Sequence, residues 1–137
     1  MGTDQDPRWR QRLARFRRAT SRLVAACAQG EYTDLERAGL VQTFAFSFEL
    51  GWKTLKDLLD HGGFPEQTPR GVLRRAFEAG HLAAADVEAA LDALDQRNLL
   101  SHTYDDEAAQ MAVDLIRSRF APLLERLLAH LEQRATP

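Results

Sequence analysis

The sequence predicts an all-α protein that folds as an antiparallel up-and-down helical bundle, with four main helices and one short helix. Ala, Leu, Arg and Glu are abundant, whereas Ile occurs once and Val is sparse, and this composition favours helix over sheet. Apolar residues recur at helical spacing through most of the chain. The connections between these segments are short, so neighbouring long helices should run antiparallel.

The first helix is expected over about residues 8–29. Leu13, Phe16 and Leu23 give it an apolar stripe, and Gly30 provides a stop signal. Arginine is concentrated in this segment and faces few acidic residues. Two interpretations of the arginine cluster stay open at this point: a solvated helix face, or a surface that follows a phosphate backbone.

The second helix is expected from Thr33 to about His61. Thr33 and Glu36 have the spacing of a capping box, in which the two side chains satisfy free N–H groups at a helix start. The helix carries one continuous apolar face, formed by Leu40, Val41, Phe44, Phe48, Trp52, Leu55 and Leu59. Trp52 belongs either to the core or to a dimer interface. Gly62 and Gly63 should end the helix.

A short third helix should begin at Thr68 and close at Gly80, because Thr is a good N-cap and Pro69 suits the first turn. The fourth helix is expected over about residues 84–99. A fifth should begin at residues 105–107, where acidic side chains favour a helix N-terminus, and continue through Leu131. Pro122 predicts a kink within it.

Length and composition limit the number of domains and the kinds of site that the chain can carry. At 137 residues we expect one domain over residues 1–137, with a core of about 8–134. Cys27 is the only cysteine, the histidines lack metal-ligand spacing and no Gly-rich phosphate loop occurs, so we expect neither a metal nor a cofactor. The start of the chain is charged and no long apolar run follows it. We therefore expect no signal peptide, no membrane span and a cytoplasmic location.

The strongest functional signal lies between the fourth and fifth helices. Arg97, Asn98, His102 and Tyr104 fall within eight residues. Arg can bind a phosphate through two parallel hydrogen bonds, and His is the side chain best suited to move protons near neutral pH. These residues form a plausible metal-independent site for RNA cleavage. The alternative is structural: an Arg and a His near a helix end often bind backbone or carboxylate groups.

The geometry of this segment depends on a break in the helix. Residues five apart on a regular helix point about 140° apart, so Arg97 and His102 would diverge on an unbroken helix. Asn98, Ser101 and Asp105 favour turns and caps, so a break here would let the two side chains converge. A twofold dimer offers a second route, in which one chain's Arg97 meets the other chain's His102.

Glu49 and Lys53 are the supporting residues outside this segment. They are four apart on the second helix, a spacing that allows an ordinary surface ion pair. Alternatively, Glu49 reaches Arg97 across the bundle and fixes its orientation. Sequence reasoning leaves these two interpretations open.

The chain resembles the HEPN superfamily and, within it, the nucleotidyltransferase substrate-binding family that includes the HepT toxins. Residues 48–53 are similar to that family's Phe-Glu-Leu-x-Trp-Lys helix, and residues 97–104 to its Arg-x4-His-x-Tyr signature. Residues 70–80 also resemble the family's third helix. The likeness covers about residues 10–132. The N-terminal arginine cluster belongs to no family pattern.

This resemblance implies a homodimeric, HEPN-like bundle that acts as a metal-independent ribonuclease toxin of a toxin–antitoxin pair. It implies a partner, a minimal nucleotidyltransferase encoded nearby, which silences the toxin by transferring AMP to Tyr104. His102 would act as general base or acid, and Arg97 would hold the scissile phosphate. Asn98 would position Arg97 or the phosphate. The RNA substrate, tRNA or mRNA, is left open. The alternatives are a non-catalytic nucleotide- or substrate-binding subunit of a two-component nucleotidyltransferase, and a helical dimer whose polar cluster is structural.

Overall fold

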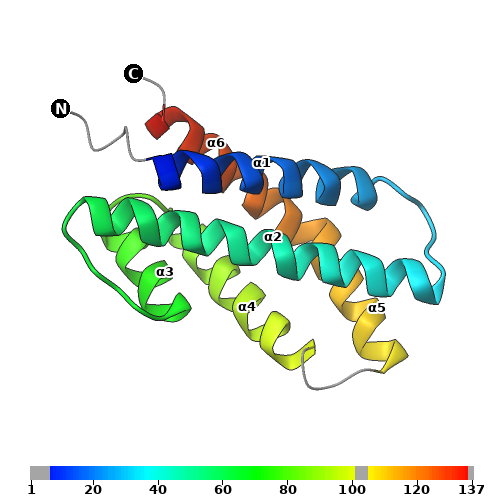
Figure 1. Cartoon of the computed structure of the whole chain (residues 1–137). Helices are drawn as coiled ribbons and strands as arrows, with labels where there is room; N and C mark the ends of the chain where they lie inside the picture. The colour runs from blue at the N-terminus through cyan, green and yellow to red at the C-terminus, as the bar shows by residue number, and fades with distance from the viewer. Residues whose placement is uncertain (1–6, 101–104, 136–137) are drawn as a thin grey trace.

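The computed structural model describes residues 7–100 and 105–135, which form a bundle of antiparallel helices (Figure 1). This confirms the predicted all-α fold class. The helical elements are α1 (Pro7–Cys27), α2 (Asp34–His61), α3 (Pro69–Glu78), α4 (Ala84–Leu100), α5 (Asp106–Leu115), the π-helical turn η2 (Ile116–Phe120) and α6 (Ala121–Ala135). Among the described residues, none of these helices has the length and apolar content needed to cross a membrane.

Local capping explains where three helices begin. The Thr33 hydroxyl accepts a hydrogen bond from the backbone N–H of Glu36, whose carboxylate accepts one from the N–H of Thr33. Thr68 caps α3 through the N–H of Gly71. Asp105 caps α5 through the N–H of Ala108. Side-chain caps of this kind satisfy donors that lack a partner within the helix, so the predicted helix starts are confirmed.

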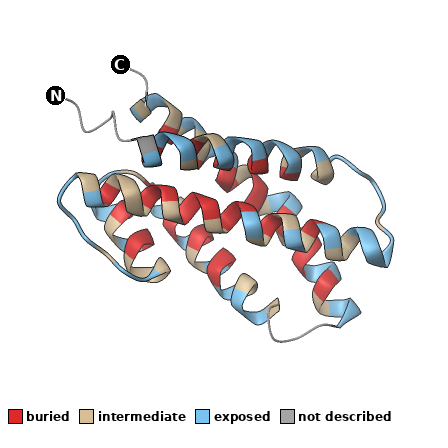
Figure 2. Ribbon diagram, in the orientation of Figure 1, coloured by how far each residue is buried: buried red, intermediate tan, exposed pale blue. Residues whose placement is uncertain are grey.

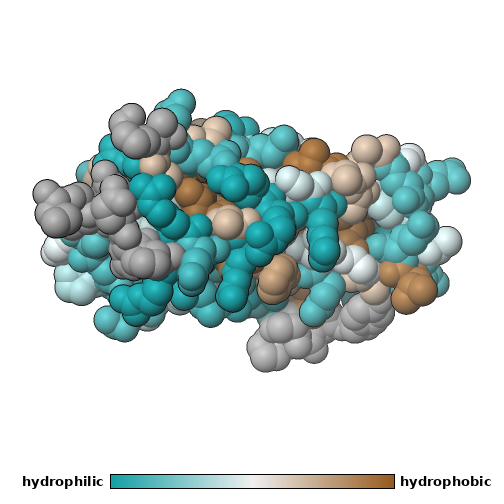
Figure 3. All heavy atoms as spheres, turned by 45° about the horizontal axis from the view of Figure 1, so that its top comes forward, coloured by the Kyte–Doolittle hydropathy of each residue, from teal (hydrophilic) through white to brown (hydrophobic). Residues whose placement is uncertain are grey.

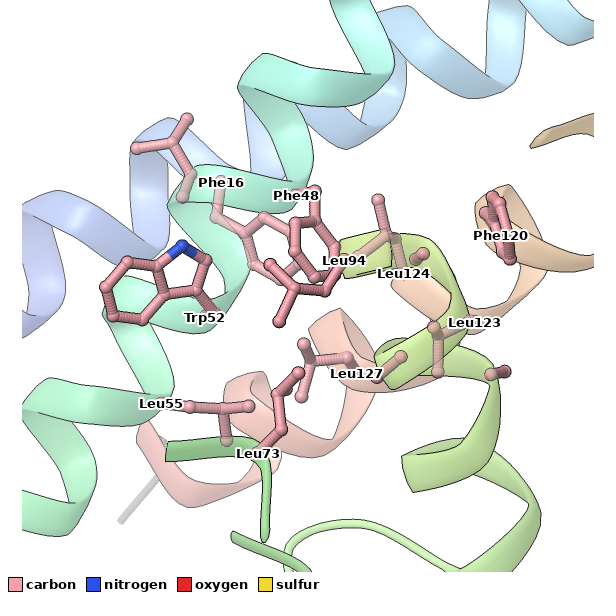
Figure 4. Close-up of a cluster of buried hydrophobic side chains, with 14 of the residues drawn as sticks. Phe16, Phe48, Trp52, Leu55, Leu73, Leu94, Phe120, Leu123, Leu124 and Leu127 are labelled. Carbon is pink, nitrogen blue, oxygen red and sulfur yellow. The ribbon is translucent and has the colours of Figure 1, made fainter. Parts of the chain in front are cut away.

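Helix α2 lies at the centre of the bundle and contacts all the other α-helices (Figure 1). Its buried residues form a continuous band along the helix (Figure 2). The close-up in Figure 4 shows how this band meets side chains of the other helices. Members of this core include Phe16, Phe48, Trp52, Leu55, Leu73, Leu94, Phe120, Leu123, Leu124 and Leu127. Trp52 is therefore a core residue, which decides between the two alternatives that the sequence left open.

The last helical stretch contains a feature that differs slightly from the sequence prediction. The sequence predicts a kink at Pro122, and the structure has a π-helical turn directly before it, at Ile116–Phe120. The N–H of Ala121 donates to the carbonyl oxygen of Ile116, five residues back. Pro122 has no N–H and cannot continue the regular ladder, so the irregularity falls on the preceding turn. The chain then continues as α6 to Ala135, which includes Leu131 as the sequence predicts.

Candidate functional site

Arg97 lies in the last turn of α4 and is held by an acidic residue of α2. Its Nη2 donates to Oε1 of Glu49 across 2.6 Å. The Arg97 side chain is 31% exposed and that of Glu49 is 28% exposed. The guanidinium is therefore fixed at one nitrogen and still reachable from solvent. A guanidinium carries five N–H donors, so this contact leaves donors for a further anion.

Glu49 has two more partners on its own helix. Its Oε1 also accepts a hydrogen bond from Nε1 of Trp52 at 3.2 Å, and its Oε2 lies 3.2 Å from Nζ of Lys53. Both interpretations of Glu49 from the sequence thus describe real contacts: it pairs with Lys53 along the helix and with Arg97 across the bundle. Sequence reasoning missed the Trp52 contact. Its signal in the sequence is the spacing of three between Glu49 and Trp52, which places both side chains on one helix face.

These contacts keep Glu49 ionised. Burial would raise the pKa of the Glu49 carboxyl, but hydrogen bonds from Lys53 and Trp52 and the positive charge of Arg97 outweigh burial and hold the pKa below its usual value. One carboxylate is shared by two cations, Arg97 and Lys53. The cluster therefore keeps one net positive charge, which suits an anionic ligand.

A shallow hollow of about 230 Å³ opens beside Arg97. Its walls come from α2 and from the end of α4, and they are mainly apolar: Val41, Phe44, Ala45 and Leu100, with the amide of Gln42. Asn98 follows Arg97 on the exposed side, and its Oδ1 lies 3.5 Å from Nη1 of Arg97. The arrangement places a guanidinium and two amide side chains at the edge of an apolar surface.

Three of the residues predicted for this site lie outside the described part of the chain: Ser101, His102 and Tyr104. Helix α4 ends at Leu100 and the next described residue is Asp105. The predicted convergence of Arg97 and His102 therefore remains a prediction. The structure brings together Arg97, Asn98, Glu49 and Lys53, the predicted site residues that it describes.

The histidines show one arrangement that sequence reasoning missed. Nδ1 of His81 lies 3.0 Å from Nε2 of His130, although the two residues are 49 positions apart. Burial, then the charges of Arg134 and His130, lower the pKa of His81 from 6.5 to about 4. No local spacing indicates such a pair. No group of three or more His, Cys, Asp or Glu residues in the described chain is placed to hold a metal ion.

Comparison with known proteins places the chain in a family. The family profile described as nucleotidyltransferase substrate binding protein like matches residues 11–133. A crystal structure of a protein from Thermus thermophilus is similar, with a TM-score of 0.79 and 30% sequence identity, and the likeness covers 85% of this chain and 98% of that chain. A search of curated proteins found no match.

The chain is thus a helical-bundle protein that presents a carboxylate-oriented arginine beside a mainly apolar hollow. This chain belongs to the nucleotidyltransferase substrate-binding protein-like family. The resemblance inferred from residues 48–53 and 97–104 is confirmed at the level of this family.

Proposed function

We propose that this protein is a HepT-like ribonuclease toxin of the HEPN type, paired with a minimal nucleotidyltransferase that neutralises it. The observation that carries the proposal is the Arg97 guanidinium, which Glu49 orients at the end of α4, five residues before His102. A fixed, partly exposed guanidinium is suited to hold a phosphodiester and to stabilise the charge that develops on it. The cluster's net positive charge supports the same role.

The proposed reaction needs no metal ion. His102 takes the proton of a ribose 2′-hydroxyl, and the 2′-oxygen attacks the adjacent phosphorus. The bond from phosphorus to the 5′-oxygen breaks, that oxygen takes up a proton from water, and His102 returns the proton it accepted to the solvent. The products are a 2′,3′-cyclic phosphate and a 5′-hydroxyl. Arg97 holds the non-bridging phosphate oxygens throughout, and Asn98 positions Arg97 or the phosphate.

The proposal includes a twofold dimer in which the two copies of the motif line one cleft. Trp52 cannot supply the interface because it is buried within its own chain. Exposed apolar side chains offer an alternative surface: Leu99, two residues after Arg97 on α4, is 50% exposed and Met111 on α5 is 61% exposed. Burial of such residues between two copies would be favourable. The partner in regulation is the nucleotidyltransferase, which would add AMP to Tyr104.

A second candidate function is a non-catalytic subunit that binds the nucleotide or substrate of a partner nucleotidyltransferase. The mainly apolar hollow beside Arg97 supports it, because a flat base would lie against Val41 and Leu100 while Arg97 binds a phosphate. The family description fits this candidate equally well.

The deciding experiment combines growth and purified-protein assays. Wild-type protein expressed without its partner should arrest growth, and Arg97→Ala and His102→Ala should each relieve the arrest. The purified wild type should cut RNA in the presence of EDTA. If wild type and both variants leave RNA intact and affect growth equally, the ribonuclease proposal is wrong. Nucleotide binding that depends on Arg97 but not on His102, with no RNA cleavage, would favour the second candidate.

A further inference from the structure

Three arginines of α1 share one face and line a groove. Arg15, Arg18 and Arg22 are three and four residues apart, a spacing that places them on the same side of a helix. At about 1.5 Å of rise per residue they span roughly 10 Å along α1. All three side chains are exposed. The ribonuclease mechanism above makes no use of them.

Helix α2 forms the other wall. Gln42, Thr43 and Phe46 face the three arginines across a groove of about 480 Å³, which we call the arginine groove. Among the residues that the structure describes, no carboxylate lines it. Hydrophilic side chains predominate over the middle of the face on which α1 and α2 lie (Figure 3). Phe46 is 61% exposed, because it lies two residues from both Phe44 and Phe48 and so points away from the buried face of α2.

The three arginines differ from their neighbours on α1 in how they are paired. Arg12 binds Asp57 at 3.0 Å, and Arg17 binds Glu132 at 2.5 Å. Within residues 7–100 and 105–135, Arg15, Arg18 and Arg22 have no acidic partner. Three guanidiniums on one helix face repel each other, and an anion bound between them removes that repulsion.

The groove leads toward the candidate site. Gln42 lines both the arginine groove and the hollow that contains Arg97. The two depressions therefore meet at one side chain on the exposed face of α2. An extended ligand lying in the groove would reach Arg97 without crossing a buried element.

We propose that the arginine groove binds single-stranded RNA, with phosphates on Arg15, Arg18 and Arg22 and one base stacked on Phe46, and that it guides the strand to Arg97. This inference rests on the proposed ribonuclease function and extends it from the scissile phosphate to the flanking strand. Cationic side chains along a groove with an exposed aromatic ring are the features by which proteins hold single strands. Gln42 adds an amide that can bind a base edge or a sugar.

Other occupants fit these features less well. A second copy of the chain, related by a twofold axis through the groove, would bring six guanidiniums together and would be repelled. A double helix keeps its bases stacked inside and would leave Phe46 unused. An acidic protein segment would match the charge but not the exposed ring, so the effect of Phe46 decides between RNA and protein.

The test measures binding of a labelled single strand of about 12 nucleotides with 2′-O-methyl sugars, which cannot be cleaved because the attacking hydroxyl is blocked. The groove variant is Arg15→Ala/Arg18→Ala/Arg22→Ala in the full chain. The matched control, Arg74→Ala/Arg126→Ala/Arg134→Ala, removes the same charge elsewhere. Circular dichroism confirms that each variant is folded.

The groove variant should bind at least about tenfold more weakly, and its slope of log K against log salt should be smaller by about 2, since each lost phosphate contact on a single strand accounts for roughly 0.7. The control should change affinity less than about twofold, as expected for distant exposed charges. Phe46→Ala should weaken binding about fivefold or more, and Phe46→Trp should retain it.

Equal binding by the groove variant and the control would overturn the inference, as would a wild type that does not bind the strand. It would also be overturned if Phe46→Ala has no effect and a polyglutamate peptide competes as well as RNA, an outcome that assigns the groove to an acidic protein. Arg97→Ala separates the two proposals: it should abolish cleavage of unmodified RNA, but weaken binding of the uncleavable strand only by the share of one phosphate contact, well short of the loss in the groove variant. Groove-dependent binding without cleavage by wild type supports this inference and refutes the ribonuclease function.

Discussion

Oε1 of Glu49 accepts hydrogen bonds from both Arg97 and Trp52, so one oxygen ties the end of α4 to a buried indole of α2. The indole is 8% exposed and cannot move far, and it thereby fixes the carboxylate. The carboxylate in turn fixes the guanidinium. Glu49 is a positioning residue in this arrangement, and its effect should appear in turnover more than in binding.

Glu49→Gln should slow RNA cleavage about tenfold, a loss of about 1.4 kcal/mol in transition-state stabilisation. The amide keeps an acceptor for Trp52 but loses the charge that orients Arg97. Affinity for the uncleavable strand should stay the same or increase, because a negative charge near the phosphate is removed. Single-turnover rates and anisotropy titrations measure the two quantities separately.

Lys53→Gln is the matched control for that experiment. It breaks the ion pair between Lys53 and Glu49, in which Nζ lies 3.2 Å from Oε2. The contact between Glu49 and Arg97 stays in place. An exposed pair of this kind contributes only about 0.3–0.5 kcal/mol, so cleavage should change less than about twofold. A larger loss with Lys53→Gln than with Glu49→Gln would show that Arg97 does not depend on Glu49.

Two glycines of α2 should respond oppositely to the same substitution. A Cβ on Gly51 would lie 3.1 Å from two ring carbons of the fully buried Phe16, whereas a Cβ on Gly39 would meet no atom within 4 Å. Gly39→Ala should raise the free energy of unfolding by about 0.5–1 kcal/mol through helix propensity. Gly51→Ala should lower it by about 1 kcal/mol, because overpacking of about 1–3 kcal/mol exceeds the propensity gain. Urea unfolding compares them, and shifts in the same direction would contradict this packing argument.

The His81–His130 pair should make stability depend on pH. Burial, with the charge of Arg134, lowers the pKa of both imidazoles, that of His81 from 6.5 to about 4. As pH falls below 6.5, the unfolded chain takes up protons that the native chain does not. The free energy of unfolding should therefore decrease as the pH is lowered from 6.5 to 4. Above pH 6.5 it should keep its full value.

For the two histidines we expect a loss of about 1–2 kcal/mol between pH 7.5 and pH 5, measured by urea unfolding at each pH. His81→Gln/His130→Gln should flatten this dependence. His61→Gln is the control, since it leaves the pair intact and should retain the slope. A double variant with the same slope as wild type would rule out the pair as the source.

Co-expression with the partner nucleotidyltransferase should modify Tyr104. Intact-mass spectrometry should show an increase of about 329 Da per AMP added, or a multiple of it. The added phosphate would compete with RNA for Arg97. Tyr104→Phe should keep the unmodified mass and escape neutralisation. Full neutralisation with no change in mass would mean that the partner acts by binding alone.

Much of the fold could be predicted because it depends on local patterns. The capping residues Thr33, Thr68 and Asp105 mark helix starts by spacing alone, and the apolar face of α2 is continuous in the sequence. The contact between Glu49 and Arg97 is one of two alternatives that the sequence allows, since only the packed bundle decides which faces of α2 and α4 meet.

Other features depend on tertiary placement and left no local signal. His81 and His130 come from the loop after α3 and from α6, so their separate positions near helix ends say nothing about their contact. The arginine groove likewise needs α1 and α2 side by side before Gln42 and Phe46 meet the arginines. Proline chemistry predicts a disturbance near Pro122, but only packing decides that it takes the form of a π-helical turn.

That turn sets the phase of the helix that follows it. A π-helical turn accommodates one more residue than an α-helical turn, and each residue of an α-helix advances the face by about 100°. Before the turn, α5 packs against α2 and buries Ala112 and Val113; after it, α6 packs against α1 as well. Removing one residue from Ile116–Phe120 would rotate the whole of α6 by about 100° relative to α5. Leu124, Leu127 and Leu131 would keep their identities and their helix, yet point toward the wrong neighbours.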